Sequence, residues 1–245
     1  MTPLRNLALF ARAPTPGKSK TRLIPRLGAQ GACDFAEAAL IDILHLMSEI
    51  EQSRRTLFYT PKDAGPGLQK MLQREALSDF WELQPQPDTE DLGGRLQAAL
   101  EYLQTGNASV QAVTSSSPDL NAAATFIGMD CFDLTPDSVC QSMDLVSGSK
   151  STAHIVDAMD GGYVLLTIPL ACDGDRVFSN IAWSTDRTGQ MQKQRLHEAG
   201  LKCDVGEALS DVDEPEDLDR LWETRVDWSA GFPLTTRFMQ GVMET

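Results

Sequence analysis

Basic side chains gather near the start of the chain, where they are candidates for binding an anion. Residues 1–33 contain six of the 21 Lys and Arg residues and none of the 35 Asp and Glu residues. Most of these cations stand in the run FARAPTPGKSKTRL, from Phe10 to Leu23, whose prolines and glycine interrupt any helix or strand. On a chain of net charge −14, this patch attracts a small polyanion, while the acidic remainder repels nucleic acid and anionic membranes.

The residues on either side of this run predict how the loop is held. Leu7 to Phe10 is typical of a buried strand, and a helical pattern begins shortly after Gly28. A strand, a basic loop and a helix in this order form a common phosphate-binding arrangement. We therefore expect Lys18, Lys20 and Arg22 to neutralise nucleotide phosphates rather than to be only solvated surface charges.

The triplet Gly17-Lys18-Ser19 also matches the end of the nucleotide-binding P-loop. That motif needs a glycine five residues before Gly17, and Arg12 occupies the position. An ordinary P-loop ATPase is therefore excluded.

Carboxylates in two predicted loops form a candidate metal site. Asp130 directly follows the strand-like run Ala124 to Met129, and open α/β sheets bind ligands where the carboxyl ends of strands meet loops. Asp211 stands before a helix start whose cap we assign to Asp213 and the acidic residues after it. A divalent cation bound with a nucleotide takes one or two protein carboxylates. We predict that Asp130 and Asp211 hold Mg²⁺ or Mn²⁺.

Three further observations bear on the polar candidates. No Lys or Arg occurs between Gln97 and Ser149, so a bound cation is the natural partner for the charge of Asp130. The three histidines lack partners at metal-ligand spacing, and we expect them to be structural. Asp160 begins an Asp-Gly-Gly sequence between two strand-like runs, where it is either a turn residue or a catalytic one.

The periodicity of apolar residues predicts an α/β fold with a mostly parallel central sheet flanked by helices. The predicted strands are Leu7–Phe10, Arg55–Tyr59, Phe80–Leu83, Ala124–Met129, His154–Met159, Tyr163–Ile168 and Leu201–Val205. The predicted helices are 29–51, 67–76, 92–103, 136–145, 187–199 and 215–226.

One domain is expected over residues 1–225, because the chain is 42% hydrophobic and contains no long Gly/Ser-rich or Pro-rich linker. Residues 226–245 are too apolar for a free tail, so we expect them to pack on the domain or on a partner, which allows a homodimer. The segment Thr105 to Ala124 is rich in Ser, Ala, Asn and Thr and is predicted to be a mobile surface insertion.

Composition also predicts the compartment. The five scattered cysteines show no C-x-x-C spacing, which is typical of reduced thiols and not of zinc ligands. The first apolar run is too short for a signal sequence, and the longest later run, Tyr163 to Cys172, is too short to span a membrane. We therefore expect a cytoplasmic protein.

Six motifs occur in the order FARAPTPGKSKTRL, DLGGRL, GMDCFDLTP, DGGYVLL, WSTD and DVDEPEDL, between about Leu7 and Leu221. They resemble the bacterial glycosyltransferase-like family of radical-SAM- and selenodomain-associated transferases, within the nucleotide-diphospho-sugar transferase superfamily. The first motif is more distantly similar to phospholactate guanylyltransferases and molybdenum-cofactor nucleotidylyltransferases. The resemblance implies a single Rossmann-like domain of the GT-A fold that binds a nucleotide or nucleotide-sugar and a small-molecule acceptor.

The resemblance also implies site residues. It implies a nucleotide beneath the basic loop, a metal at Asp130 with a second contact near Asp211, and catalytic roles for Asp130 and Asp160. The implied nucleotide-binding residues are Ala11, Arg12, Gly17, Lys18, Lys20, Arg22, Gly93 and Arg95, and the implied substrate-binding residues are Gly161, Gly162, Tyr163, Trp183, Ser184 and Thr185.

The chain departs from the family pattern in three places. Phe132 replaces a proline, Val156 to Met159 replaces a Gly-Pro-Ala-Glu-like run beside the acceptor site, and the insertion at 105–124 is long. The preferred interpretation is metal-dependent transfer of a glycosyl group from an NDP-sugar to a small acceptor. The alternatives are nucleotidylyl transfer from an NTP, which the dense basic loop favours, and a regulatory nucleotide-binding protein without catalysis, which the altered run favours.

Overall fold

A seven-stranded sheet forms the centre of the molecule. The computed structural model describes residues 5–89, 91–105 and 122–244, so most of the predicted 105–124 insertion lies outside the described residues. The strand order is β3-β2-β1-β4-β6-β5-β7, and β6 runs antiparallel to its two neighbours while the other described pairs are parallel. The mostly parallel sheet predicted from the sequence is confirmed. The strands are β1 (Arg5–Arg12), β2 (Ser53–Thr60), β3 (Glu82–Pro85), β4 (Ala123–Ile127), β5 (Thr152–Asp157), β6 (Tyr163–Pro169) and β7 (Lys202–Val205).

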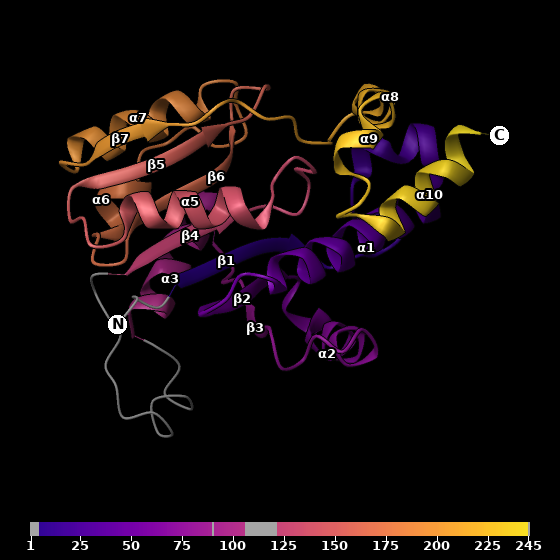
Figure 1. Ribbon diagram of the computed structural model, residues 1–245, viewed down its shortest axis with the longest axis horizontal. Coiled ribbons are helices and arrows are strands. Elements are labelled where there is room, and N and C mark those ends of the chain that lie inside the picture. Colours follow the sequence, from indigo (N-terminus) through magenta and orange to yellow (C-terminus); the bar gives the residue numbers. More distant parts are fainter. Residues whose placement is uncertain (1–4, 90, 106–121, 245) are drawn as a thin grey trace.

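Helices cover both faces of this sheet (Figure 1). Alternate side chains of β1 enter two separate cores: Leu7 and Leu9 pack with residues of α1, and Ala8 packs with residues of α3. The helices are α1 (Ile24–Ser48), α2 (Gly65–Arg74), α3 (Leu92–Thr105), α5 (Pro136–Val146), α6 (Gly174–Phe178), α7 (Thr188–Glu198), α8 (Pro215–Glu223), α9 (Arg225–Trp228) and α10 (Pro233–Met243), with single 3-10 turns η1 (Thr21–Leu23) and η2 (Lys62–Ala64).

Most predicted elements are present, with changes at their ends. The helix predicted from residue 29 begins at Ile24 and bends at Gly28, whose φ of 71° is left-handed. The third strand begins two residues later than predicted, at Glu82. Trp81, just before it, is buried and donates its indole N–H to the carbonyl of Leu44 (3.0 Å). This contact turns the chain before the strand begins.

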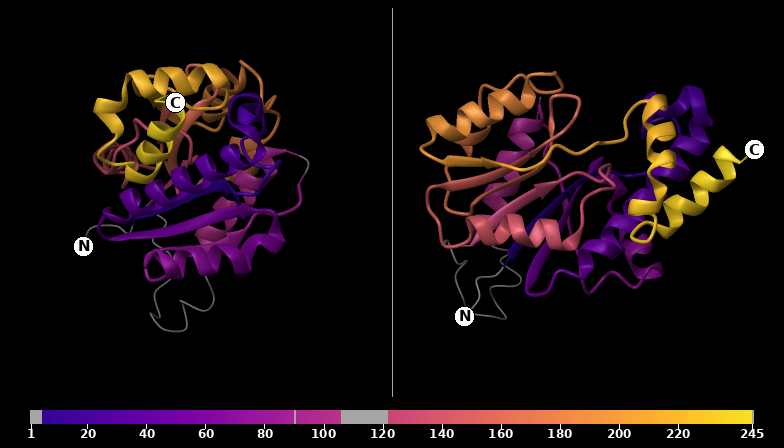
Figure 2. Two further views of the ribbon diagram at one scale, coloured as in Figure 1. Left: turned by 90° about the vertical axis from the view of Figure 1, so that its right-hand side faces the viewer. Right: turned by 45° about the horizontal axis from the view of Figure 1, so that its top comes forward.

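The last helix packs along the first long helix. α10 lies beside α1 in both views of Figure 2. The buried carboxylate of Asp42, on α1, accepts the N–H groups of Leu234 (3.1 Å) and Thr235 (2.7 Å) at the start of α10. These N–H groups have no partner within their own helix, so α1 supplies the cap of α10.

Phe132, which stands where the family pattern has a proline, belongs to an aromatic group at this contact. Its ring centroid lies 4.8 Å from that of Phe232 and 5.3 Å from that of Trp228. It also lies 5.9 Å from the ring of Phe35 on α1. Phe132 follows Asp130 by two positions, so the C-terminal helices support the loop that carries this carboxylate.

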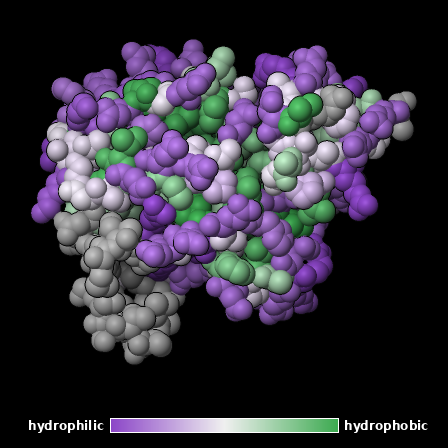
Figure 3. All heavy atoms as spheres, viewed as in Figure 1, coloured by the Kyte–Doolittle hydropathy of each residue, from purple (hydrophilic) through white to green (hydrophobic). Residues whose placement is uncertain are grey.

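The face of the molecule drawn in Figure 3 is mostly hydrophilic, with apolar residues in small separate patches. Among the helices that the structure describes, none is both long and apolar enough to cross a membrane. All five cysteines are free thiols, as the sequence predicted.

Candidate functional site

A cleft of about 350 Å³ opens at the sheet edge where β1, β4 and β5 end and β6 begins. Its lining comes from the basic loop and from the DLGGRL, DGGYVLL, WSTD and DVDEPEDL motifs. All predicted substrate-binding residues except Gly161 line it, together with Arg22, Asp160 and Asp211. The lining residues are Arg22, Leu92, Ala158, Asp160, Gly162, Tyr163, Trp183, Ser184, Thr185, Asp186, Thr188, Asp211 and Asp213.

The basic loop is held in shape by Ser19, a residue to which the sequence assigned no role. Its buried hydroxyl donates to a loop carbonyl (3.0 Å) and accepts a loop N–H (2.8 Å). Gly17 has a φ of 73° and Lys20 a φ of 43°, so the chain turns twice in the left-handed region. As a result, Arg12 and Lys18 are exposed, whereas the side chain of Lys20 is turned inward.

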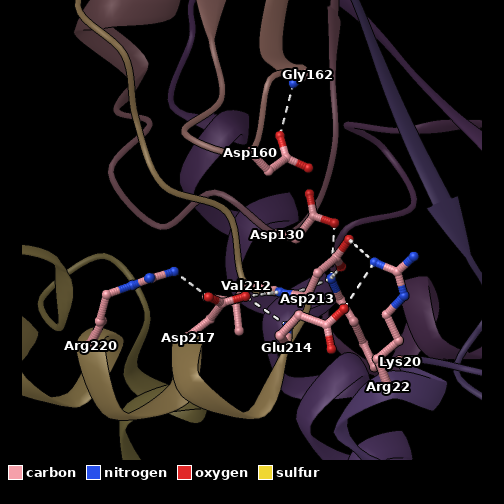
Figure 4. Close-up of polar contacts among 10 residues, drawn as sticks. All are labelled: Lys20, Arg22, Asp130, Asp160, Gly162, Val212, Asp213, Glu214, Asp217 and Arg220. Atoms are coloured by element: carbon pink, nitrogen blue, oxygen red, sulfur yellow. Dashed lines mark hydrogen bonds and ion pairs between the residues drawn. The ribbon is translucent and has the colours of Figure 1, made fainter. Parts of the chain in front are cut away.

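Oxygen atoms enclose the ammonium group of Lys20. It donates to Asp130 Oδ2 (2.9 Å), to the carbonyl of Val212 (2.6 Å) and to Asp213 Oδ1 (2.7 Å), which accounts for its three N–H groups (Figure 4). Burial alone lowers the pKa of Lys20, but the charges of Asp130 and Asp213 outweigh this effect, and the pKa is raised overall. Lys20 is therefore a stable cation among these oxygens.

The sequence missed one partner at this cluster and misplaced one role. Asp130 has no cation nearby in the sequence, but Lys20 reaches it across 110 positions. Asp213 is expected to cap α8, but its carboxylate binds Lys20, and the cap residue is Glu214. The carboxylate of Asp217 accepts the N–H groups of Asp213 (2.8 Å) and Glu214 (2.7 Å). The helix cap is therefore present, but it lies one residue later than predicted.

Glycines shape the turns that carry the two predicted catalytic carboxylates. A Cβ atom at Gly128 would lie 2.6 Å from Asp130 Oδ1, so glycine leaves room for this carboxylate. Asp160 Oδ1 accepts the N–H of Gly162 (2.8 Å). Asp160 is thus a turn residue, which was one of the two roles that the sequence predicted for it. The side chain of Asp160 also points toward Asp130 (Figure 4). Asp160 therefore forms the turn and also lies at the candidate site.

Asp211 lies among other carboxylates at the cleft. Burial raises its pKa to about 6, and the charges of Asp130, Asp160 and Asp213 add to the effect. A divalent cation relieves such repulsion, and carboxylate oxygens suit Mg²⁺ or Mn²⁺. Asp130 and Asp211 thus fit the predicted metal. No group of three or more His, Cys, Asp and Glu side chains in the described residues forms an ion site by itself, so phosphate and water would supply the other ligands.

Helix α3 approaches the WSTD segment closely. A Cβ atom at Gly93 would lie 2.6 Å from Trp183 Nε1 and from the carbonyl oxygen of Phe178, so helix packing requires this glycine. Within the described residues, Trp183 Nε1 and Arg95 Nε are buried without a hydrogen-bond partner. Neither Gly93 nor Arg95 lines the cleft, and their predicted contact with a nucleotide depends on the resemblance.

The run that departs from the family pattern ties β5 to α7. Asp157 Oδ2 accepts from Lys193 Nζ (2.6 Å), Ala158 lines the cleft, and the side chain of Met159 is 70% exposed.

The hydroxyl of Tyr163 donates to Gln192 Oε1 (3.3 Å), and burial raises the pKa of this phenol. Tyr163 therefore forms a neutral wall of the cleft.

Comparisons with solved structures identify the fold. A crystal structure from Desulfovibrio desulfuricans G20, provisionally described as a nucleotide-diphospho-sugar transferase, aligns with a TM-score of 0.78 and 21% identity over 98% of this chain and 97% of that chain. The 4-diphosphocytidyl-2C-methyl-D-erythritol synthase of Anaerococcus prevotii aligns with a TM-score of 0.52 and 9% identity over 91% of this chain and 96% of that one. The Rossmann-like fold predicted from the motifs is confirmed.

No curated protein matches this sequence. A protein-family model matches residues 43–185, more than half of the chain, and the matched segment includes the DLGGRL, GMDCFDLTP and DGGYVLL motifs. Several of the residues that line the cleft thus lie inside the matched segment, whereas the basic loop precedes it. The chain belongs to the family described as "Uncharacterized protein conserved in bacteria (DUF2064)".

Proposed function

We propose that this protein is a metal-dependent transferase that moves a glycosyl group from a nucleotide-diphospho-sugar to a small acceptor. The observation that carries the proposal is the cleft that joins Arg22 of the basic loop to Asp160 and Asp211. The guanidinium suits a diphosphate, and the carboxylates suit a metal ion and an acceptor hydroxyl. The fold shared with the Desulfovibrio structure supports the same class of reaction.

Each part of the cleft has a role in this proposal. Arg22, which lines the cleft, receives the diphosphate together with Arg12 and Lys18, which are exposed outside that lining. Asp130 and Asp211 would hold Mg²⁺ or Mn²⁺, which would supply positive charge to stabilise the leaving diphosphate.

Asp160 accepts the proton of the acceptor hydroxyl as the oxygen attacks the sugar carbon, and the bond from that carbon to the diphosphate breaks. The rings of Trp183 and Tyr163 give the sugar an apolar wall.

A second candidate is nucleotidylyl transfer, in which a phosphate group of the substrate attacks the α-phosphate of an NTP and pyrophosphate leaves. The observation that favours it is the exposure of three cations, Arg12 at the end of β1, Lys18 in the loop that follows and Arg22 in η1, the last of which pairs with Glu214 (3.2 Å). Three cations suit the larger charge of a triphosphate.

Product analysis separates the two candidates. The protein is incubated with Mn²⁺, a panel of NDP-sugars or NTPs, and pooled hydroxyl and phosphate acceptors. Glycosyl transfer predicts free NDP from an NDP-sugar, with the signal lost in EDTA and in Asp160→Asn but kept in Asp88→Asn, an exposed loop carboxylate. Pyrophosphate from an NTP would select the second candidate. Binding of a nucleotide without either product would indicate the regulatory protein and contradict both.

A further inference from the structure

Lys20 occupies one of the two carboxylate oxygens of Asp130, Oδ2, where a cation bound to that oxygen would stand. Its ammonium nitrogen lies 2.9 Å from Asp130 Oδ2 and 2.7 Å from Asp213 Oδ1, and 10% of its side chain is exposed. Two cations on one half-buried carboxylate repel each other strongly, because little water lies between them to screen the charges. The ammonium of Lys20 therefore opposes metal binding at Asp130 as long as it stays in this position.

The same contacts prevent the ammonium group of Lys20 from binding phosphate. Its three N–H groups are directed at Asp130, Val212 and Asp213, so none is left for a nucleotide. Moving Lys20 alone would leave Asp130 without its cation and Asp213 with only the guanidinium of Arg22 (4.0 Å), which is unfavourable in a partly buried site. Exchange becomes favourable when a divalent cation replaces the ammonium on the carboxylates and a phosphate receives it.

The backbone of Lys20 is in a conformation that is uncommon for a residue with a side chain. Its φ of 43° and ψ of 49° lie in the left-handed region, which is costly for a residue with a Cβ atom. Gly17, three positions earlier, is also left-handed with a φ of 73° and adopts other conformations freely. The ion cluster holds the side chain of Lys20, and the N–H of Leu23 donates to its carbonyl (2.9 Å).

We propose that Lys20 is an internal counter-ion that couples metal binding to phosphate binding. It holds Asp130 and Asp213 in the free protein, and it passes to a phosphate oxygen when a divalent cation takes its place. The proposal rests on the proposed function for the identity of the two ligands. Lys20 is thus a positioning residue for the carboxylates before it is a ligand of the nucleotide.

Direct Mn²⁺ titration tests the first half of the exchange. Lys20→Met keeps the apolar stem and removes the charge, and we expect it to bind Mn²⁺ alone about tenfold more tightly than the unaltered protein. Lys18→Met removes an exposed charge from the same loop and should change the affinity by no more than about twofold, because water screens that charge. Equal or weaker Mn²⁺ binding by folded Lys20→Met would overturn the proposal.

Pyrophosphate, which needs no knowledge of the base or sugar, tests the coupling. In the unaltered protein and in Lys70→Met, which removes an exposed charge of α2 outside the cleft, pyrophosphate should bind more tightly with Mn²⁺ than with EDTA, and Lys20→Met should lose most of this difference. The Lys70 variant corrects for complex formation between Mn²⁺ and pyrophosphate in solution. An equal dependence on Mn²⁺ in the two variants would contradict the coupling.

Amine labelling of the unaltered protein gives a test that does not depend on a variant that folds. Reductive methylation followed by mass spectrometry should find Lys20 protected relative to Lys18, and saturating Mn²⁺ should expose it. If Lys20 stays protected from labelling in Mn²⁺, it is a permanent structural cation and the proposal is wrong. These binding and labelling results do not involve turnover. An absence of transfer products would therefore count against the proposed function and leave the counter-ion exchange standing.

Discussion

Asp211 is the carboxylate at the cleft whose surroundings oppose ionisation most clearly. Burial is the main cause, and the charges of Asp130, Asp160 and Asp213 add to it. Asp130 and Asp213 face similar neighbours, but each has the ammonium of Lys20 as a direct partner. The repulsion among these carboxylates is therefore felt most clearly by Asp211.

This difference predicts how stability depends on pH. The pKa of Asp211 is raised from 3.8 to about 6 on folding, so the folded state binds more protons than the unfolded state between these values. The contribution of this group to stability is thus present at low pH and is lost as the pH rises through about 6.

Asp211→Asn should stabilise the metal-free protein by roughly 1 kcal/mol at pH 8, after allowance for solvent screening, and this gain should shrink toward pH 4.5. Thermal unfolding in EDTA at both pH values measures it, with Asp88→Asn as the exposed control. A gain that is the same at both pH values would contradict the assignment.

The sequence could name most residues of the site but not their pairing. The motifs pointed to Lys20, Asp130 and Asp211, and all three lie at or beside the cleft. The ion cluster was missed because its members are 110 and 193 positions apart, and local charge counts carry no information on such contacts. Ser19 was missed because a buried serine in a loop has no periodic signal.

At the scale of elements, the spacing of apolar residues predicted helices and strands correctly wherever the apolar run was long. The first helix, β1, β2, β4 and the β5–β6 hairpin have the expected positions because a single apolar face or a fully buried run defines each. The five residues of α6 are too few to show a period. The start of β3 was misplaced because Phe80 and Trp81 are apolar but precede the strand, Phe80 largely exposed and Trp81 buried.

A pair of glycine substitutions tests the packing of α3 against the WSTD segment. Gly93→Ala would place a methyl group 2.6 Å from a backbone oxygen, so the helix must shift, and we expect a loss of about 1–3 kcal/mol. Gly67→Ala, inside α2, meets nothing within 4 Å and should stabilise the protein by about 0.5–1 kcal/mol. Chemical denaturation measures both. Stabilisation by both changes would show that α3 does not pack tightly here.

At the scale of the whole molecule, the C-terminal helices cover one face of α1 and pack against the loop after β4. The sequence showed that residues 226–245 are apolar, but the surface that they cover depends on tertiary shape. Phe132 and Asp42 are separate in the sequence, yet both contact the last helices, one through its ring and the other through its carboxylate.

Asp42 is the polar part of this contact and can be tested by itself. Asp42→Ala removes the acceptor of two N–H groups at the start of α10 and should cost about 1–3 kcal/mol. Asp34→Ala, at an exposed position of the same helix, should cost much less. Urea unfolding gives the free energies, and limited proteolysis should cut the first variant earlier near residues 229–235. Equal losses in the two variants would argue against the cap.

The contact between the first and last long helices has a consequence for synthesis. A ribosome completes α1 at Ser48 but does not reach Pro233, the first residue of α10, until 185 codons later. At about 5–20 residues per second, the nascent chain carries the apolar face of α1 without this cover for roughly 10–40 s. Asp213, which binds Lys20, is also made late. The basic loop is translated well before Asp213, so the contact that holds Lys20 can form only after that residue has been made.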